Sequence, residues 1–196
     1  QKPSFDHEIC AGLNRLYFHT FTCSPTEMGL PGQEYFAGTH INPQVTWWEK
    51  SGALIDYIRR VQMLVQNGKF VADVLYYYGD HVPNVFPFKE WDPAGAMPGF
   101  DYDETVFTQL KVKNRKIVVP GGITYQVLVL PDHRILSLTV LEKIKELLEQ
   151  GAHVIGYKPE KMVSLVGGVS AQGHFKQLSD EIWGTAHDVY GERAYG

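Results

Sequence analysis

Residues 126–157, QVLVLPDHRILSLTVLEKIKELLEQGAHVIGY, decide the fold class of this 196-residue chain. The run QVLVL (126–130) is continuously apolar, which is typical of a strand covered on both faces. Leucine and isoleucine then recur at spacings of three and four residues over 138–150, and this pattern predicts an amphipathic helix that ends at Gly151. Because AHVIGY (152–157) is a second apolar run, the stretch predicts a β-α-β unit with a right-handed crossover.

A second strand–helix–strand series precedes this unit. Residues 15–22 (RLYFHTFT) form a β-prone aromatic run and predict a buried strand. Apolar residues at helical spacing predict a helix over 48–67, and FVADVLYYY (70–78) predicts the next strand. Further expected elements are the end of a helix at 6–13, a short helix at 102–110, a hairpin at 111–125 with turns at 114–115 and 120–122, and a helix at 175–183.

This order of elements predicts an α/β fold in two pieces. We interpret residues 1–68 as the close of a larger α/β structure that continues beyond them. Residues 69–196 are expected to form an open, doubly wound α/β domain that stops without a terminating element. The chain starts at Gln1 and shows no signal-peptide pattern, so we expect that a preceding part has been removed.

The composition excludes several classes of function. A formal net charge of −4 argues against a nucleic-acid partner. No apolar run approaches the roughly 20 residues of a membrane helix. The eight histidines are scattered and show no zinc-binding spacing with Cys10 or Cys23, so no metal site is predicted. Two isolated cysteines are more often free than paired, although an exported protein allows a disulfide.

The loop at residues 23–46 and the residues directly after it form the first candidate site. Loops this long inside compact domains are commonly functional, and in barrel enzymes the loops after the strands build the active site. Aromatic faces stack on a sugar ring, while amides and imidazoles bond its hydroxyls. Suitable side chains are those of Glu27, Gln33, Glu34, His40, Asn42, Trp47, Trp48 and Glu49.

Several of these residues also have a purely structural interpretation. Trp47 or Trp48 is equally consistent with a core position that fixes the start of the following helix. His19, within FHTF, fits a packed side chain as well as a substrate contact, whereas His40 lies in the loop and is the better contact candidate.

No pair of catalytic carboxylates is predicted. Glycoside hydrolysis normally needs two carboxyl groups that flank the scissile bond, about 5–10 Å apart. The three candidates lie at no predicted strand end, and one of them opens a helix, where the helix dipole explains a carboxylate. They are Glu27, Glu34 and Glu49.

The second piece carries charged residues at two predicted strand ends, which is where a doubly wound fold binds ligands. No GxGxxG or P-loop follows either strand, so a nucleotide or flavin cofactor is not predicted. Since no cysteine follows Cys23, a cysteine nucleophile is also excluded there. We therefore interpret these residues as capping and solvated groups: Asp80, His81, Asp132 and His133.

Four stretches together resemble glycoside hydrolase family 106, whose known activity is α-L-rhamnosidase. They are GLNRLYFHTF (12–21), PGQEYFAGTHINPQVTWWE (31–49), FVADVLYYYGDHVPN (70–84) and the block from YQVLVL to GYKP (125–159). The resemblance covers nearly the whole chain. It is most specific in FHTF, in GTHINP followed by TWW, and in YYYGD.

The resemblance implies a large, exported, multidomain enzyme, periplasmic or extracellular, with a catalytic (β/α)8-type barrel. Residues 1–68 would be the last strand–helix segment of that barrel. Residues 69–196 would be a flavodoxin-like domain resembling the non-catalytic amidotransferase-like domain of several β-galactosidases. The catalytic carboxylates and the main calcium ligands are then expected outside this chain, which leaves calcium to the parent enzyme and no cofactor to this segment.

The family motifs also imply substrate-side positions in the first piece. Carried over residue by residue, they place five residues at the active-site end of the barrel: His19, His40, Asn42, Trp47 and Trp48. The leading hypothesis is therefore an inactive segment of an α-L-rhamnosidase-like hydrolase that contacts a carbohydrate. The alternative is a non-catalytic carbohydrate-binding or interaction module. We expect apolar surface left by an incomplete barrel either to fold back on the second domain or to self-associate.

Overall fold

The computed structural model describes residues 1–37, 40–77, 79, 98–99, 107–131 and 133–185. The chain forms two compact units, Gln1–Phe70 (unit 1) and Val71–Gly196 (unit 2). The sequence predicts the boundary after residue 68. Within the described residues no helix is long and apolar enough to cross a membrane.

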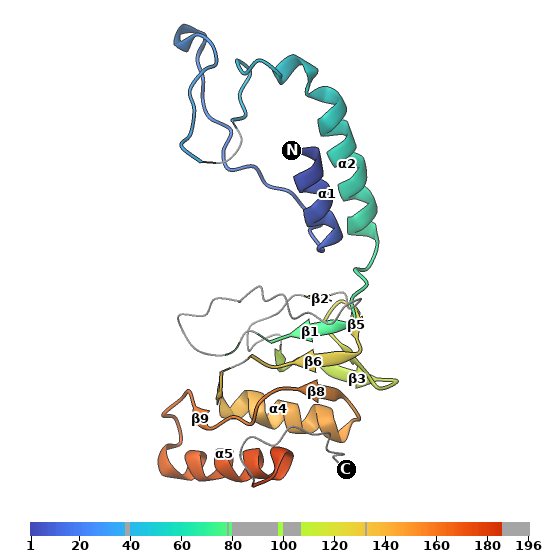
Figure 1. Cartoon of the computed structure of the whole chain (residues 1–196), viewed down its shortest axis with the longest axis vertical. Coiled ribbons are helices and arrows are strands. Elements are labelled where there is room, and N and C mark those ends of the chain that lie inside the picture. The colour runs from blue at the N-terminus through green and yellow to red at the C-terminus, as the bar shows by residue number, and fades with distance from the viewer. Residues whose placement is uncertain (38–39, 78, 80–97, 100–106, 132, 186–196) are drawn as a thin grey trace. The chain divides into compact units, whose positions relative to one another are not determined.

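The α-helices of unit 1 are α1 (Lys2–Cys10) and α2 (Gly52–Asn67) (Figure 1). The ring of Phe5, which is buried, packs edge-on against Tyr57 of α2 at 6.1 Å between centroids. The Tyr57 hydroxyl donates to Asp6 at 2.7 Å, and Lys2 also binds Asp6. The two helices are therefore joined by one aromatic contact with a charged cluster beside it.

The predicted helix over 48–67 is confirmed, with a different beginning. Residues Trp48–Lys50 form a short 3-10 helix, η2, and the α-helix starts only at Gly52. A second 3-10 turn, η1, covers Thr26–Met28. The expected helix end at 6–13 is the end of α1, where Gly12 adopts a positive φ of 108° against the ring of Phe70.

The strand predicted at residues 15–22 is wrong. The backbone there is irregular, and its one β-type contact is an isolated parallel bridge between Phe21 and Ile41. Tyr17 is 76% exposed and Phe21 is 57% exposed, so the run is not buried. An aromatic run becomes a buried strand only when neighbouring strands pair with it. Within the described part of unit 1, Ile41 is the one residue that forms a β-bridge with this run.

Unit 2 contains a parallel four-stranded sheet in the order β2-β1-β6-β8 (Figure 1). Its strands are β1 (Val74–Tyr76), β2 (Pro98–Gly99), β6 (Val127–Val129) and β8 (His153–Ile155). Leu75 pairs with Leu128, and Leu128 pairs with Val154, so the register is fixed across the three longer strands. The predicted strands at 70–78, 126–130 and 152–157 are thus present and shorter than expected.

Helix α4 (Leu138–Glu149) connects β6 to β8 and completes the predicted β-α-β unit. Ser137 caps it, because its hydroxyl accepts a hydrogen bond from the Val140 amide at 3.2 Å. Four side chains of its inner face are fully buried: Val140, Leu141, Ile144 and Leu147. This buried face is the core that the three-and-four spacing of the sequence predicts.

Helix α5 (Gly168–Trp183) lies beside α4 (Figure 1). Lys145 of α4 donates to Glu181 of α5 at 2.8 Å. The helix begins seven residues before the predicted start at 175, within the glycine-rich run that follows Gly167. The buried side chains all lie within residues 175–183, the part of the helix that the sequence predicts.

The predicted hairpin at 111–125 is confirmed as an antiparallel sheet of β3 (Lys111–Lys113), β4 (Lys116–Val118) and β5 (Thr124–Tyr125). Asn114 and Arg115 form its first turn with positive φ values of 53° and 60°. Two consecutive positive φ values are those of a type I′ turn, which matches the twist of the flanking strands. The short helix expected at 102–110 lies mostly outside the described residues.

A third pairing joins two strands of two residues each, β7 (Ile135–Leu136) and β9 (Lys161–Met162), in parallel. Between β8 and β9 the chain is hydrogen-bonded to the C-terminal half of α5. The described structure is therefore an α/β fold with parallel sheets.

Candidate functional site

The loop predicted to carry the site is tied to the segment that precedes it. The bridge between Phe21 and Ile41 sets residues 19–22 alongside residues 40–42. Ile41 and Val45 are buried in this region, each at 8% exposure. A short apolar anchor thus holds the end of the long loop next to His19.

Asn42 forms the centre of this loop. Its side chain is completely buried. The Nδ2 group donates to the carbonyls of Pro31 at 3.2 Å and Gln33 at 3.4 Å. Its Oδ1 accepts from the Gln44 amide at 2.7 Å, which makes an Asx turn. Asn42 therefore cross-links three backbone positions of the loop.

Ser24 and Gln44 extend the polar core. Ser24 Oγ accepts from the Gln33 amide at 2.9 Å, and Gln44 Nε2 donates to the Pro25 carbonyl at 2.8 Å. Gly32 sits against all three polar side chains with a φ of +84°, and a Cβ there would approach Asn42 Oδ1 and Gln44 Oε1 at 2.7 Å each. Only glycine fits this position, because the conformation and the close packing both exclude a side chain.

Five aromatic rings lie on this loop and the segments beside it, and those of His19, Phe21 and Phe36 are exposed while those of Tyr35 and Trp48 are half-buried. His19 contacts Tyr35 edge-on at 5.1 Å between centroids, and Tyr35 contacts Phe36 at 4.4 Å. Phe21 contacts Trp48 edge-on at 5.7 Å. Phe36 is 90% exposed. We call these rings, His19, Phe21, Tyr35, Phe36 and Trp48, the aromatic surface of unit 1.

His40 offers a polar group beside this surface. Its Nε2 lies 3.9 Å from Glu34 Oε2. Its Nδ1 is buried and finds no hydrogen-bond partner among the described residues. Leaving such an atom unpaired costs about 1–3 kcal/mol, so a hydroxyl group that reached it would be favoured.

The five residues predicted to face a substrate have different surroundings. His19 and Trp48 belong to the aromatic surface, and His40 lies at the end of the same loop. Trp47 is half-buried at the start of η2. The polar groups of Asn42 are already bound to the backbone, which gives it a loop-positioning role here. Substrate contact by any of the five stays a prediction.

The sequence reasoning missed the residues that hold the loop together, Ser24, Gly32 and Gln44. One signal was available, since Asn42-Pro43 is a dipeptide that favours turn initiation. The sequence does not reveal that Gly32, ten residues earlier, packs on that turn. Among the carboxylates considered, Glu27, Glu34 and Glu49 are all exposed.

In unit 2 the strand order reverses between β1 and β6, because the chain leaves β1 toward β2 and later returns on the other side. Gly79 and His133 meet beyond the carboxyl ends of these strands, where a Cβ on Gly79 would lie 2.4 Å from His133 Nε2. His133 Nδ1 also accepts from the Ile135 amide at 3.4 Å. Asp80, His81 and Asp132, the other polar residues predicted at these ends, lie outside the described residues.

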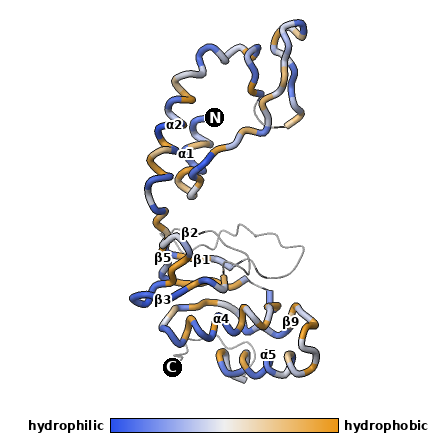
Figure 2. Tube along the Cα trace, turned by 180° about the vertical axis from the view of Figure 1, so that it is seen from behind, coloured by the Kyte–Doolittle hydropathy of each residue, from blue (hydrophilic) through white to orange (hydrophobic). Residues whose placement is uncertain are grey.

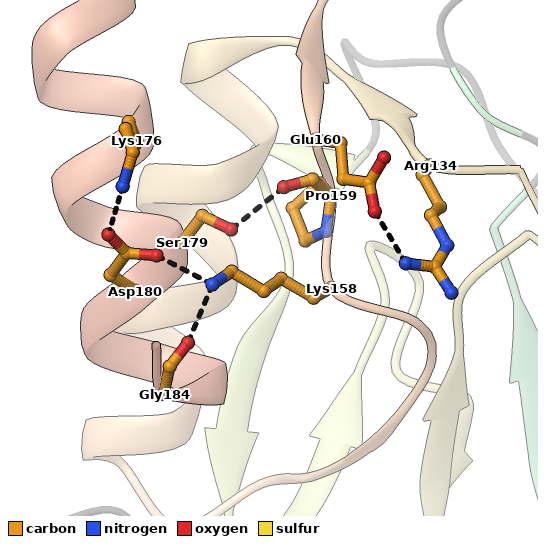
Figure 3. A network of polar contacts seen from close by, with 8 residues as sticks. All are labelled: Arg134, Lys158, Pro159, Glu160, Lys176, Ser179, Asp180 and Gly184. Atoms are coloured by element: carbon orange, nitrogen blue, oxygen red, sulfur yellow. Dashed lines mark hydrogen bonds and ion pairs between the residues drawn. The ribbon is translucent and has the colours of Figure 1, made fainter. Parts of the chain in front are cut away.

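A polar network fixes the chain between β8 and β9 to α5 (Figure 3). Lys158 Nζ donates to Asp180 and to the carbonyl of Gly184, both at 2.6 Å, and Lys176 binds the other oxygen of Asp180. These two ammonium groups lower the pKa of the Asp180 carboxyl from its ordinary 3.8 to about 2. The network therefore holds the segment between β8 and β9 against α5, and we call Lys158, Lys176 and Asp180 the α5 clamp.

No group of three histidine, cysteine, aspartate or glutamate side chains that could hold a metal occurs within the described part of the chain. The calcium site implied by the family resemblance stays a prediction for the larger enzyme. Cys10 and Cys23 are exposed free thiols.

Comparison with known proteins decides the family. The family described as alpha-L-rhamnosidase, glycoside hydrolase family 106, matches residues 1–196, the whole chain. The chain belongs to glycoside hydrolase family 106. The resemblance seen in the four sequence stretches is thereby confirmed, and the chain is a rhamnosidase-like member of this family.

Two relatives of this family 106 chain cover most of it. A protein of Formosa agariphila named "Putative beta-glucuronidase" is 38% identical over 183 residues, which is 91% of this chain and 15% of that protein. The solved structure of a rhamnosidase from Novosphingobium sp. PP1Y matches 93% of this chain and 18% of its own, with a TM-score of 0.75 and 25% identity. The chain spans less than a fifth of the length of either relative.

Proposed function

We propose that this chain is one segment of a larger glycoside hydrolase that cleaves α-L-rhamnosides, and that unit 1 supplies one wall of its sugar pocket. The observation that carries the proposal is the aromatic surface, a set of exposed and half-buried rings on and beside a loop whose polar core is already folded. Membership of the family and the length of the two relatives support it.

In this proposal the loop binds and orients, and the proton-transfer groups belong to other parts of the larger enzyme. A general acid needs a buried setting to keep its proton near neutral pH. The three glutamates of the loop region are exposed, which supports leaving acid and base catalysis to residues outside this chain. Ring faces of Trp48 and Tyr35 would stack on the sugar, and His40 would bond a hydroxyl.

The finer architecture belongs to the same proposal. We place residues 1–68 as the last segment of a (β/α)8-type barrel, with α2 as its helix and with residues 15–22 not paired as a strand within this chain. Residues 69–196 are assigned to a flavodoxin-like or amidotransferase-like domain. The parallel order β2-β1-β6-β8, with its reversal between β1 and β6, supports the second assignment. We further propose that the larger enzyme is exported and that any calcium it uses is held outside this chain.

The test compares the larger enzyme with the isolated chain, using an aryl α-L-rhamnoside. In the larger enzyme, Trp48→Ala should lower kcat/KM about tenfold, the loss of roughly 1.4 kcal/mol of ring contact. Tyr157→Ala, which removes a half-exposed ring from unit 2, should leave kcat/KM unchanged. The isolated chain should show no turnover, because one wall cannot hold two carboxyl groups in register. Turnover by the isolated chain that a Glu→Gln change abolishes would overturn the proposal.

A second candidate is a carbohydrate-binding or interaction module that works without catalysis. The folded loop favours it, because a preorganised surface can bind a sugar with little ordering cost. Saturable binding of rhamnose by the isolated chain, abolished by Trp48→Ala, would support this candidate. Sedimentation that shows a monomer would count against self-association through the aromatic surface.

A further inference from the structure

We propose that the β3–β4 hairpin of unit 2 is a second glycan site, separate from the aromatic surface, and that it binds a polysaccharide bearing carboxylate or sulfate groups. The hairpin, residues 111–118, carries four exposed cations: Lys111, Lys113, Arg115 and Lys116. Figure 2 shows β3 and the turn after it as a hydrophilic stretch. No role in the proposed rhamnoside cleavage uses these residues.

Three of the cations share one face of the hairpin. Lys113 lies opposite Lys116 in the antiparallel register, and Lys111 lies two residues before Lys113 on the same strand. Residues two apart on a strand, and residues directly opposite, point to the same side. The other side is apolar, since Ile117 opposite Val112 is fully buried. We call Lys111, Lys113 and Lys116 the lysine face.

The cations of the hairpin have no acidic partner among the residues that the structure describes. None of the four forms an ion pair with any residue that the structure describes. Other lysines of the chain do pair: Lys143 binds Glu146, and Lys158 binds Asp180. The whole chain has a formal net charge of −4, so this positive cluster runs against its overall charge.

The charges of the lysine face lower the stability of the hairpin. Like charges directly opposite each other on a two-stranded ribbon repel and destabilise the pairing. An anion bound across Lys113 and Lys116 would remove that repulsion and would stabilise the folded state by binding it selectively. The arrangement therefore favours a ligand that brings negative charge.

An apolar hollow adjoins the lysine face. A cavity of about 390 Å³ is lined by Gln109, Lys111, Val118, Val119, Pro120 and Gly122. Val118 lies opposite Lys111 in the hairpin register, so the hollow and the lysine face meet at this pair. A sugar ring has an apolar C–H face and polar edges, and an acidic sugar adds a charge at the edge. The combination of hollow and cations fits such a ring.

A nucleic acid would offer the same charge, and the observations favour a glycan. The chain belongs to a glycoside hydrolase family, which favours a glycan as the ligand. None of the described residues that line the hollow carries an aromatic ring to stack a base, as proteins that bind single-stranded nucleic acids use. Nucleic-acid binding is therefore an outcome that the test must separate.

The test titrates the whole 196-residue chain with oligogalacturonate, with dextran sulfate, with neutral dextran of similar length and with a single-stranded oligonucleotide. We expect saturable binding of at least one acidic glycan at low salt, weakening as salt screens the charges, and no binding of dextran. Lys113→Gln with Lys116→Gln should weaken that binding about tenfold, the effect of two lost exposed ion pairs. The affinity for oligogalacturonate compared with that for dextran sulfate shows whether the site prefers a carboxylate or a sulfate group.

The matched control removes two exposed lysines elsewhere, Lys50→Gln with Lys161→Gln, and should bind as the unchanged chain does. The melting temperature of the Lys113→Gln, Lys116→Gln variant should not fall, which shows that the hairpin still forms. The proposal is overturned if neither acidic glycan binds, if both double variants lose affinity equally, or if the oligonucleotide binds as tightly as the glycans. Trp48→Ala should not alter this binding, so its result is independent of the rhamnoside proposal.

Discussion

The loop of unit 1 and the β-α-β unit of unit 2 reach an ordered structure by different means. In β6-α4-β8 the order comes from apolar side chains, and Leu128, Leu141 and Ile144 are completely buried. In residues 23–46 the one completely buried residue is polar: the amide of Asn42 holds three backbone groups, and the ring of Phe36 stays exposed. Burial of apolar surface is non-directional, whereas hydrogen bonds fix geometry. The comparison teaches that a loop can be preorganised while its apolar surface remains free for a ligand.

The largest expected effect tests the apolar side of this comparison. Leu141→Ala should lower the free energy of unfolding of unit 2 by about 2–5 kcal/mol, because it leaves a cavity under a fully buried side chain. Denaturant unfolding followed by circular dichroism measures it. Val169→Ala is the control, since Val169 is 85% exposed on α5 and its loss should cost less than about 0.5 kcal/mol. Equal losses in the two variants would refute an apolar origin of the stability.

The next effect tests the polar side. Asn42→Ala should cost unit 1 about 2–4 kcal/mol, because the Gln44 amide and two carbonyls lose their partner. Hydrogen exchange should speed up at amides 24–44 and stay unchanged in α4. Gln66→Ala is the control, since it removes an exposed amide-to-carbonyl bond to Asn14 and should have little effect. Uniform exchange changes throughout the chain would contradict a local role for Asn42.

A smaller effect concerns the start of α4. Ser137→Ala removes the cap on the Val140 amide and should cost about 1 kcal/mol. Ser51 occupies the same position before α2 but makes no capping bond, so Ser51→Ala is a matched control that should be nearly neutral. Thermal unfolding of both variants compares one helix of each unit. A loss of stability in Ser51→Ala as large as in Ser137→Ala would contradict a role for the capping hydrogen bond.

The smallest effect is the acid dependence of the α5 clamp. The pKa of Asp180 is depressed to about 2, so its contribution to stability is present above its unfolded pKa near 4 and is lost as pH falls from 4 toward 2. Asp180→Asn should therefore be less stable than the unchanged chain at pH 7, and the difference should shrink between pH 4 and 2. Asp56→Asn, at an exposed pair with Arg59, is the control. A difference that stays constant with pH would contradict the role of the ion pairs.

Prediction from the sequence succeeded where the pattern was long and local. Helices α2 and α4 and the turn at Asn114-Arg115 follow from periodicity and turn chemistry alone. The early start of α5 was missed, because glycine is a poor helix former and only packing of the later turns on α4 overcomes this. Strands β7 and β9 were missed because two residues carry no readable alternation.

The sequence by itself determined the α/β class, the main helices, the strands of the β-α-β unit and the family, since these depend on residue types at short spacings. Only the tertiary structure decided that residues 15–22 form no strand beyond one bridge, that Asn42 and Gly32 meet, and that three lysines share one face beside a hollow. Such features depend on which distant residues come together, and packing and register fix that, while local propensity does not.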